Sequence, residues 1–252
     1  MEAMMPDGKA LQMGTSHFLG QNFSKPFDVK FLDKDNIENF AWQTSWGVSW
    51  RLIGAFIMVH GDDKGLVLPP RVAPIQVVVV PIYYSESDRA QVLKKAQDIV
   101  QALSENKIRT RLDSRDEFTP GYKFHDWEMK GVPLRIEIGP KDIAKNKIVL
   151  VRRDDQKKID LAFDKLVQGI ESGLNEMQQS MFEKTKSFLK EKTKNVSDFD
   201  IFKSELEKGM FLSSPWCGDQ KCEEKIKELT GADIRVIPFD NNSVASSCIN
   251  CK

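Results

Sequence analysis

The run of mostly β-branched residues at positions 75–82, IQVVVVPI, constrains the fold of this chain more than any other segment. A strand with apolar side chains on both sides has to be buried on both faces, as the strands of parallel sheets are. In the next segment, apolar residues recur at helical spacing from Val92 to Leu103, and Ser85 and Asp88 can cap the helix at its start. Together the two patterns predict a sheet with a helix packed on it.

Strand and helix patterns continue to alternate up to position 190. Further strands are expected at 108–112, 134–138 and 148–152. Between them, Pro120 and Gly131 stand where a short helix begins and ends. A long amphipathic helix is expected over residues 159–190, with one apolar stripe of Leu166, Ile170, Leu174, Met177 and Met181. This alternation predicts an α/β domain with a mostly parallel sheet.

The two ends of the chain have different patterns. The first part contains short alternating stretches, such as PFDVKFLD and FIMV, between Gly- and Asp-rich turns, which is typical of antiparallel sheet with loops. The last part is a small α+β segment around the cysteines. We therefore expect a multidomain chain of α/β and α+β parts, with domains at 1–73, 74–192 and 193–252.

The four cysteines, Cys217, Cys222, Cys248 and Cys251, form two close pairs separated by an insert long enough for a helix. This spacing suits a tetrahedral zinc site in which each pair supplies one edge, and we favour that hypothesis. Two disulfides or four unrelated thiols are the alternatives. A closed shell of thiolates leaves no position for a substrate, so the zinc ion would be structural.

Residues 43–74, QTSWGVSWRLIGAFIMVHGDDKGLVLPPRVAP, place Arg51 in a run of small and apolar residues that can pack a core. An arginine buried in such a run has to meet an anion, because an unpaired buried charge costs several kcal/mol. One possibility is an ion pair with a carboxylate such as that of Asp62. The other is a phosphate of a nucleotide, which a planar guanidinium suits well.

Charge and hydropathy restrict the partners. Of 252 residues, 37 are Lys or Arg and 37 are Asp or Glu, so no overall field attracts nucleic acid and an RNA site has to be a local patch. The sequence shows neither an apolar run long enough for a bilayer nor a signal-peptide pattern. We therefore expect a cytoplasmic protein without a membrane partner.

Three strings carry a resemblance to a known family: KALQMGTSHFLGQNFSKPFD at 9–28, the segment at 43–74, and GLVLPPRVAPIQVVVVPI at 65–82. They resemble the proline and adenylate loop, motif 3, and the passage into the anticodon-binding domain of class II prolyl-tRNA synthetases. The type is the archaeal and eukaryotic one with a C-terminal zinc domain. The similarity extends over nearly the whole chain. Residues 1–73 would then be the last part of the class II catalytic core.

The resemblance implies a proline–tRNA ligase, which activates L-proline with ATP and Mg²⁺ and transfers it to tRNA-Pro. It implies nucleotide contacts at Gln12, Thr15, Ser49 and Arg51, with Arg51 as the catalytic candidate. It implies a proline pocket made of His17, Ser45, Trp46 and Gly47, and it supports zinc at the four cysteines. Without the resemblance, His17 would be an ordinary loop histidine and Trp46 a core residue.

Anticodon recognition is expected in the segment TPGYKFHDWEMKGVPLRIEIGPKD, residues 119–142. A carboxylate accepts from N1–H and the amine of guanine, and Arg or Lys donates to its O6 and N7. The candidates are Glu128, Arg135 and Lys141, with Tyr122 and Trp127 as possible stacking surfaces. The alternative is a surface ion-pair network among the same groups.

The sequence also departs from the family pattern. Motifs 1 and 2, which build much of the family's homodimer interface, lie upstream of the first residue, and the family usually continues past Cys251 to a C-terminal tyrosine. We therefore expect a C-terminal fragment that cannot activate proline alone. The alternative function is a free-standing tRNA-binding module with a vestigial catalytic remnant.

Overall fold

A computed structural model describes residues 1–238 and 248–251 of the chain. The chain divides into two compact units. One consists of Met1–Met58 together with Phe188–Lys252, and the other is Val59–Ser187. The three-domain division expected from the sequence stays a prediction, and each unit is described below by itself.

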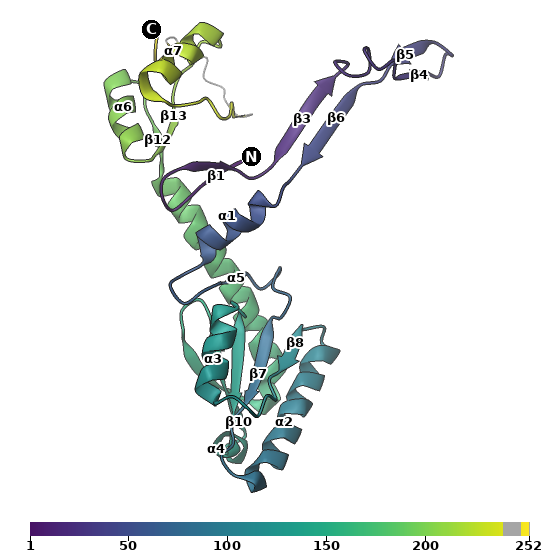
Figure 1. Ribbon diagram of the computed structural model, residues 1–252, viewed down its shortest axis with the longest axis vertical. Helices are drawn as coiled ribbons and strands as arrows, with labels where there is room; N and C mark the ends of the chain where they lie inside the picture. The colour runs from purple at the N-terminus through teal and green to yellow at the C-terminus, as the bar shows by residue number, and fades with distance from the viewer. Residues whose placement is uncertain (239–247, 252) are drawn as a thin grey trace. The chain divides into compact units, whose positions relative to one another are not determined.

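The unit Val59–Ser187 is built around a five-stranded sheet (Figure 1). Its strands are β7 (Val77–Pro81), β8 (Thr110–Leu112), β9 (Leu134–Ile138), β10 (Lys147–Arg152) and β11 (Lys158–Ala162), in the order β11-β10-β9-β7-β8. Its helices are α2 (Glu86–Glu105), α3 (Pro120–Met129), α4 (Pro140–Ala144) and the first part of α5 (Leu166–Glu191), preceded by a 3₁₀ turn at Phe163–Lys165. Every residue of β7 is buried, as its β-branched run predicts.

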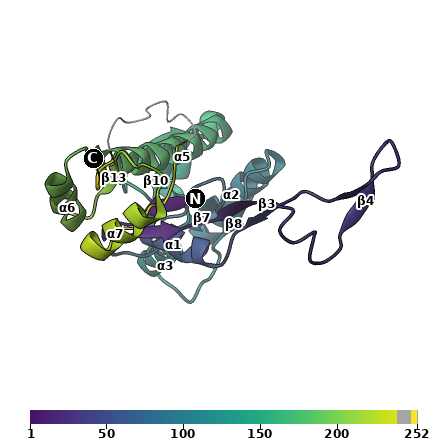
Figure 2. The ribbon, with the colours of Figure 1, turned by 90° about the horizontal axis from the view of Figure 1, so that it is seen from above.

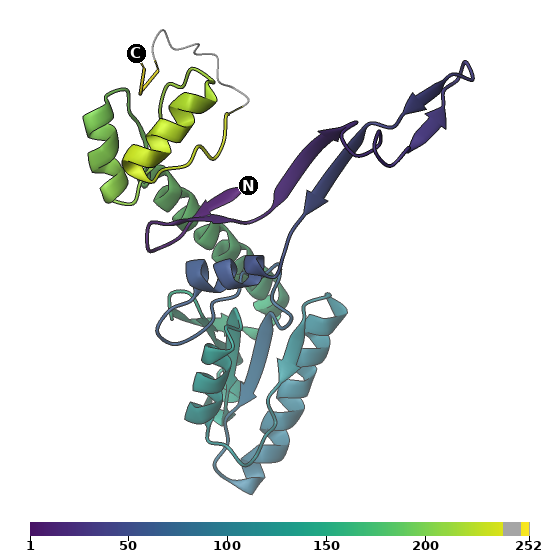
Figure 3. The same cartoon turned by 45° about the horizontal axis from the view of Figure 1, so that its top comes forward.

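Helices α2 and α3 begin where the sequence predicts. The Ser85 hydroxyl accepts from the backbone N–H of Asp88 at 3.2 Å and caps α2. One face of the sheet packs against α2 and α5, whose apolar stripe is buried as expected. On the other face, Val78 and Val80 pack against Trp127 of α3. Figure 3 shows α2 and α3 on opposite sides of β7.

The prediction of a mostly parallel sheet is wrong, because the sheet is mixed. β7 is parallel to β8 and β9, but β9 is antiparallel to β10 and β10 to β11. The connections explain the difference. A parallel crossover needs about a dozen residues or more, whereas residues 139–146 and 153–157 are too few for one and leave only antiparallel pairing.

The long helix also begins later than expected. Residues 159–162 lie in β11, paired along β10 from Lys147↔Ala162 to Val151↔Lys158. Ile159 and Leu161 alternate with polar Asp160, a period of two that is typical of a strand. Over so few residues this alternation cannot be told from the start of a helical pattern. The helix proper is α5, from Leu166.

The other unit begins with three antiparallel pairs, as the sequence predicts: β1 (Glu2–Met4) with β2 (Ala10–Gln12), β3 (Thr15–Gly20) with β6 (Gln43–Gly47), and β4 (Lys30–Leu32) with β5 (Glu38–Phe40). In Figure 2 the β3–β6 ribbon leads out to the β4–β5 pair. The FIMV stretch is not a strand, because it lies in helix α1 (Arg51–His60). The whole run from Arg51 to His60 lacks a turn signal, so the helix continues through it.

The same unit contains a small α+β segment: β12 (Thr193–Asn195), α6 (Phe199–Glu207), β13 (Phe211–Ser213) and α7 (Gln220–Thr230), with β12 parallel to β13. Its core includes Phe202, Ile226 and Ile249. Gly8 and Gly209, both at positive φ, meet backbone to backbone, so a Cβ at Gly8 would lie 3.1 Å from Cα of Gly209. This contact ties the β1–β2 hairpin to the cysteine-bearing segment.

Candidate functional site

Glu128 and Arg135, two of the three predicted anticodon residues, line the same small cavity, of about 10 Å³. Glu128 is the last residue but one of α3, with its side chain 7% exposed, and Arg135 is the second residue of β9. The Glu128 carboxylate accepts from Lys64 Nζ at 3.2 Å on Oε1 and lies 3.4 Å from His125 Nδ1 on Oε2. Sequence reasoning did not find Lys64, whose partner is 64 positions away.

The Arg135 side chain, in β9, is 13% exposed. Its guanidinium donates to Glu137 Oε1 at 2.9 and 3.1 Å and lies 4.4 Å from the ring centre of Phe124. Glu137 also pairs with Lys158 at 3.2 Å. Glu128 and Arg135 are thus both ion-paired, but with Lys64 and Glu137, which lie outside the predicted set. Lys141 takes no part in these pairs, because it lies in α4, beyond the other end of β9.

The two predicted stacking residues differ. Trp127 is 7% exposed, and its Nε1 donates to Asp113 at 2.7 Å, so it is a core residue. Tyr122 is 51% exposed and stacks on Phe118, with ring centres 4.3 Å apart. Of these two predicted stacking residues, only Tyr122 presents its ring to solvent.

A tight turn from Asp62 to Gly65 holds Lys64 beside Glu128. Asp62 and Gly65 exchange two backbone hydrogen bonds of 3.0 Å. The Asp62 carboxylate accepts from both terminal nitrogens of Arg153, at 2.6 and 2.7 Å, and this pairing lowers the pKa of Asp62 to about 2. The suggestion that Asp62 pairs with Arg51 is therefore wrong. Its partner is Arg153, whose side chain is 2% exposed.

The predicted nucleotide and proline residues lie together in the other unit. Along the β3–β6 ladder, Thr15 is opposite Gly47 and His17 is opposite Ser45. Gln12 ends β2, three residues before Thr15. Trp46 is 77% exposed, so the described residues do not enclose a pocket floor around it.

Arg51 is exposed and begins α1, so the expectation of a buried arginine is wrong. Its apolar neighbours explain this, because Leu52, Ile53 and Ile57 are 39%, 50% and 43% exposed and form no core around it. Its Nη1 donates to Gln12 Oε1 at 3.4 Å, which joins two predicted nucleotide residues. Ser49 lies next to them, and its Oγ accepts from the Arg51 backbone N–H at 3.4 Å.

The four cysteines converge as the zinc hypothesis requires. Their Sγ atoms all lie within 4.8 Å of one another, and those of Cys217 and Cys251 are 3.9 Å apart. Zn–S bonds of about 2.3 Å in a tetrahedron place sulfurs about 3.8 Å apart. All four thiols are free, so the disulfide alternative is not realised. The donor set and spacing fit Zn²⁺.

The local electrostatics of the thiols also favour a cation. Burial raises the pKa of Cys248, but backbone N–H groups of Cys251, Asn250 and Cys217 outweigh it and hold that pKa at about 6. Hydrogen bonds to the thiols of Cys222, Cys248 and Cys217 raise the pKa of Cys251 to about 12. A divalent cation at the centre of the four sulfurs would replace these hydrogen bonds, because a metal ion binds the thiolate form.

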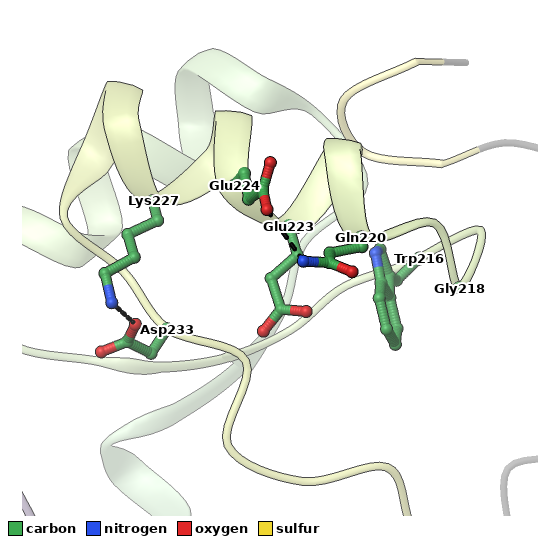
Figure 4. Close-up of a pocket in the computed structure, with 7 residues that line it drawn as sticks. All are labelled: Trp216, Gly218, Gln220, Glu223, Glu224, Lys227 and Asp233. Carbon is green, nitrogen blue, oxygen red and sulfur yellow. Dashed lines mark hydrogen bonds and ion pairs between the residues drawn. The ribbon is translucent and has the colours of Figure 1, made fainter.

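A separate open cavity of about 430 Å³ lies beside α7 (Figure 4). Two pairs of polar groups contact each other on its wall: Lys227 with Asp233 at 2.8 Å, and Gln220 with Glu224 at 2.9 Å. Trp216, on its wall, has an indole N–H without a partner among the described residues. None of the residues predicted for a functional site lines this cavity.

Comparisons with known proteins agree with this geometry. The family model of an anticodon binding domain matches residues 76–172, and that of "Prolyl-tRNA synthetase, C-terminal" matches residues 199–252. The proline–tRNA ligases of Cenarchaeum symbiosum, Natranaerobius thermophilus and Chloroflexus aurantiacus are 56%, 52% and 48% identical to this chain. Each match covers 99–100% of this chain and 52% of the relative. The chain belongs to the prolyl-tRNA synthetase family.

It spans about half the length of the curated prolyl-tRNA synthetase relatives that it matches. The match to the anticodon binding domain includes Glu128 and Arg135, and the match to the prolyl-tRNA synthetase C-terminal model includes all four cysteines. The turn that carries Lys64 precedes the first of these models. Within the described part of the chain, the helices are all too short or too polar to cross a bilayer.

Proposed function

We propose that this chain supplies the anticodon-recognition part and one wall of the aminoacylation site of a proline–tRNA ligase. The reaction joins L-proline to ATP as prolyl-adenylate and then transfers proline to tRNA-Pro. The observation that carries the proposal is the meeting of Glu128 and Arg135 at one cavity, in a unit whose sequence matches an anticodon binding domain.

Proline anticodons share two guanines, and the chemistry of the Glu128 and Arg135 side chains suits them. The Glu128 carboxylate can accept from N1–H and the exocyclic amine of an unstacked guanine. Arg135 can exchange part of its contact with Glu137 for O6 and N7 of a base, because guanidinium forks bind such edges bidentately. Lys141, farther along the surface, suits a backbone phosphate, which adds affinity without reading sequence.

For the aminoacylation site, support comes from the convergence of Gln12 and Arg51 beside the β3–β6 ladder. We expect Gln12, Thr15 and Ser49 to hold ATP, with Mg²⁺ on its phosphates. Arg51 would stabilise the charge that develops at the α-phosphate during in-line attack. We expect the proline ring to bind at His17, Ser45, Trp46 and Gly47, where a flat aromatic and a glycine suit a compact ring.

The remaining roles follow from the same assignment. Cys217, Cys222, Cys248 and Cys251 would hold a structural zinc ion that stabilises the small segment around α6 and α7. We expect a homodimer, as in the family, and a cytoplasmic protein.

ATP–pyrophosphate exchange that depends on proline tests this proposal. The chain is assayed alone, and then mixed with the part of the Cenarchaeum symbiosum relative that it does not match. We expect exchange only in the mixture, and we expect Arg51→Ala to abolish it while Lys9→Ala, an exposed lysine, does not. Tight binding of tRNA-Pro without exchange in either assay would instead identify a free-standing binding module.

A further inference from the structure

We propose that Lys64 is a specificity-determining residue that works with Glu128 to read the whole Watson–Crick edge of one anticodon guanine. This inference rests on the proposed function, in which the Glu128 carboxylate accepts from that base. It concerns a residue outside the segment that matches the anticodon binding domain.

The edge of guanine presents two adjacent donors, the exocyclic amine and N1–H, followed by one acceptor, O6. A carboxylate alone satisfies the two donors and leaves O6 unread. In the structure, the Lys64 ammonium lies 3.2 Å from Glu128 Oε1. The pair therefore supplies two acceptors and one adjacent donor, the groups that complement the edge of guanine. Adenine, with an amine at position 6 and an acceptor at N1, mismatches these groups.

The carboxylate has capacity for both the base and the lysine. Its two oxygens offer about four lone-pair sites, so Oε1 can keep Lys64 and accept a base N–H as well. The other neighbour, His125, is 84% exposed and lies 3.4 Å from Oε2, so a base can displace it at little cost. Lys64 is 56% exposed, so its ammonium faces both Glu128 and solvent.

Lys64 is also fixed in place. The turn Asp62–Gly65 is closed by two backbone hydrogen bonds, and the Asp62 carboxylate is clamped by Arg153. Arg153 Nε donates in addition to the backbone carbonyl of Glu128 at 2.8 Å, so one buried arginine positions both members of the pair. Gly65 presses on the end of α3, where an added Cβ would lie 2.6 Å from the Met129 carbonyl oxygen. A preorganised pair of this kind favours specific recognition, because little ordering remains on binding.

The probe is a proline anticodon stem–loop RNA carrying guanine, 6-thioguanine or inosine at each of the two guanine positions. In 6-thioguanine a weakly accepting sulfur replaces O6, and inosine lacks the amine. The position that Glu128 reads is the one where inosine weakens binding. There we expect the wild-type chain to bind the 6-thioguanine hairpin about tenfold more weakly than the guanine hairpin, the effect of losing one hydrogen bond to a charged group. At that position Lys64→Met should bind the guanine and 6-thioguanine hairpins equally, and Lys64→Arg should restore the difference.

Two controls separate the outcomes. Lys145→Met removes an exposed charge from the same unit and should weaken all hairpins equally. The inosine penalty, read by Glu128, should be the same in the wild type and Lys64→Met. If Lys64→Met keeps the tenfold preference for guanine over 6-thioguanine, the role of Lys64 is overturned while the proposed function stands. If the wild type and Glu128→Gln bind guanine and inosine alike, or bind no hairpin, the proposed function itself fails.

Discussion

Replacing Gly131 by alanine should destabilise the unit Val59–Ser187 far more than glycine-to-alanine changes usually do. Gly131 follows α3 with φ at +72°, and its backbone packs against the segment that begins at Leu66. A Cβ there would lie 2.7 Å from three atoms of Leu66, two of them backbone. Backbone cannot rotate away as a side-chain tip can, so the segment has to move.

The magnitude follows from two separable costs. The left-handed conformation costs alanine about 1 kcal/mol. Forcing an extra methyl into packed structure costs about 1–3 kcal/mol more. Gly231 isolates the first cost, because its φ is +71° and nothing lies within 4 Å of its Cβ position. Gly121, in α3 with the same open space and no positive φ, carries neither cost and should gain up to about 1 kcal/mol from helix propensity.

Urea-dependent hydrogen exchange, followed by mass spectrometry, measures these values because it reports on each unit separately. Peptides from β7, whose residues are all buried, report on the unit that holds Gly131, and peptides from α7 report on Gly231→Ala. We expect losses of about 2–4 kcal/mol for Gly131→Ala and about 1 kcal/mol for Gly231→Ala. A Gly131→Ala loss within about 0.5 kcal/mol of that for Gly231→Ala would refute the steric reasoning.

Three further outcomes are expected. In α5, Gly173→Ala should stabilise the folded chain by about 0.5–1 kcal/mol, since its Cβ would meet leucine methyls at ordinary distance. Gly169→Ala should not stabilise it, because that Cβ would lie 2.5 Å from a leucine methyl of β11, and thermal unfolding of both variants tests the difference. Burial raises the pKa of Asp113, but hydrogen bonds from Arg115 and Trp127 outweigh it and lower that pKa to about 2. The resulting stability, up to about 2 kcal/mol, is present above the unfolded pKa of about 4 and lost as the pH falls through 2, so Asp113→Asn should flatten the acid limb of a denaturation–pH profile. Chelation of zinc, or Cys222→Ser, should unprotect the amides of α6 and α7 in hydrogen exchange, and readdition of Zn²⁺ should restore them only in the unmutated chain.

The parts of the fold that could be predicted from the sequence are those encoded by neighbouring residues. The β-branched run of β7 and the serine that caps α2 act within a few positions of each other, so pattern and structure agree. The clustering of the four cysteines could be predicted for a related reason. Four thiolates can bind a metal ion in few arrangements, so two close pairs in the sequence already indicate that the four sulfurs lie together.

The errors have the opposite cause. Residues 159–162 satisfy strand and helix periodicity equally, and pairing with β10 decides between them. Asp62 is near Arg51 in the sequence, but its partner is Arg153, 91 positions away. Lys64 could not be found for the same reason, because a lone lysine in a turn gives no signal until its partner is known.

The arginines show how partner contacts separate structural from functional charges. Arg115, Arg152 and Arg153 each form an ion pair with a carboxylate at 2.8 Å or less. Each pair neutralises a buried or half-buried charge, which is a structural role. Within the described part of the chain, the guanidinium of Arg51 has only the 3.4 Å hydrogen bond to Gln12. Exposure alone proves nothing, since a solvated guanidinium costs nothing in water. What distinguishes Arg51 is that its weak partner is a neutral amide, which a phosphate displaces readily, whereas at Arg153 an incoming anion would first have to displace a clamped carboxylate.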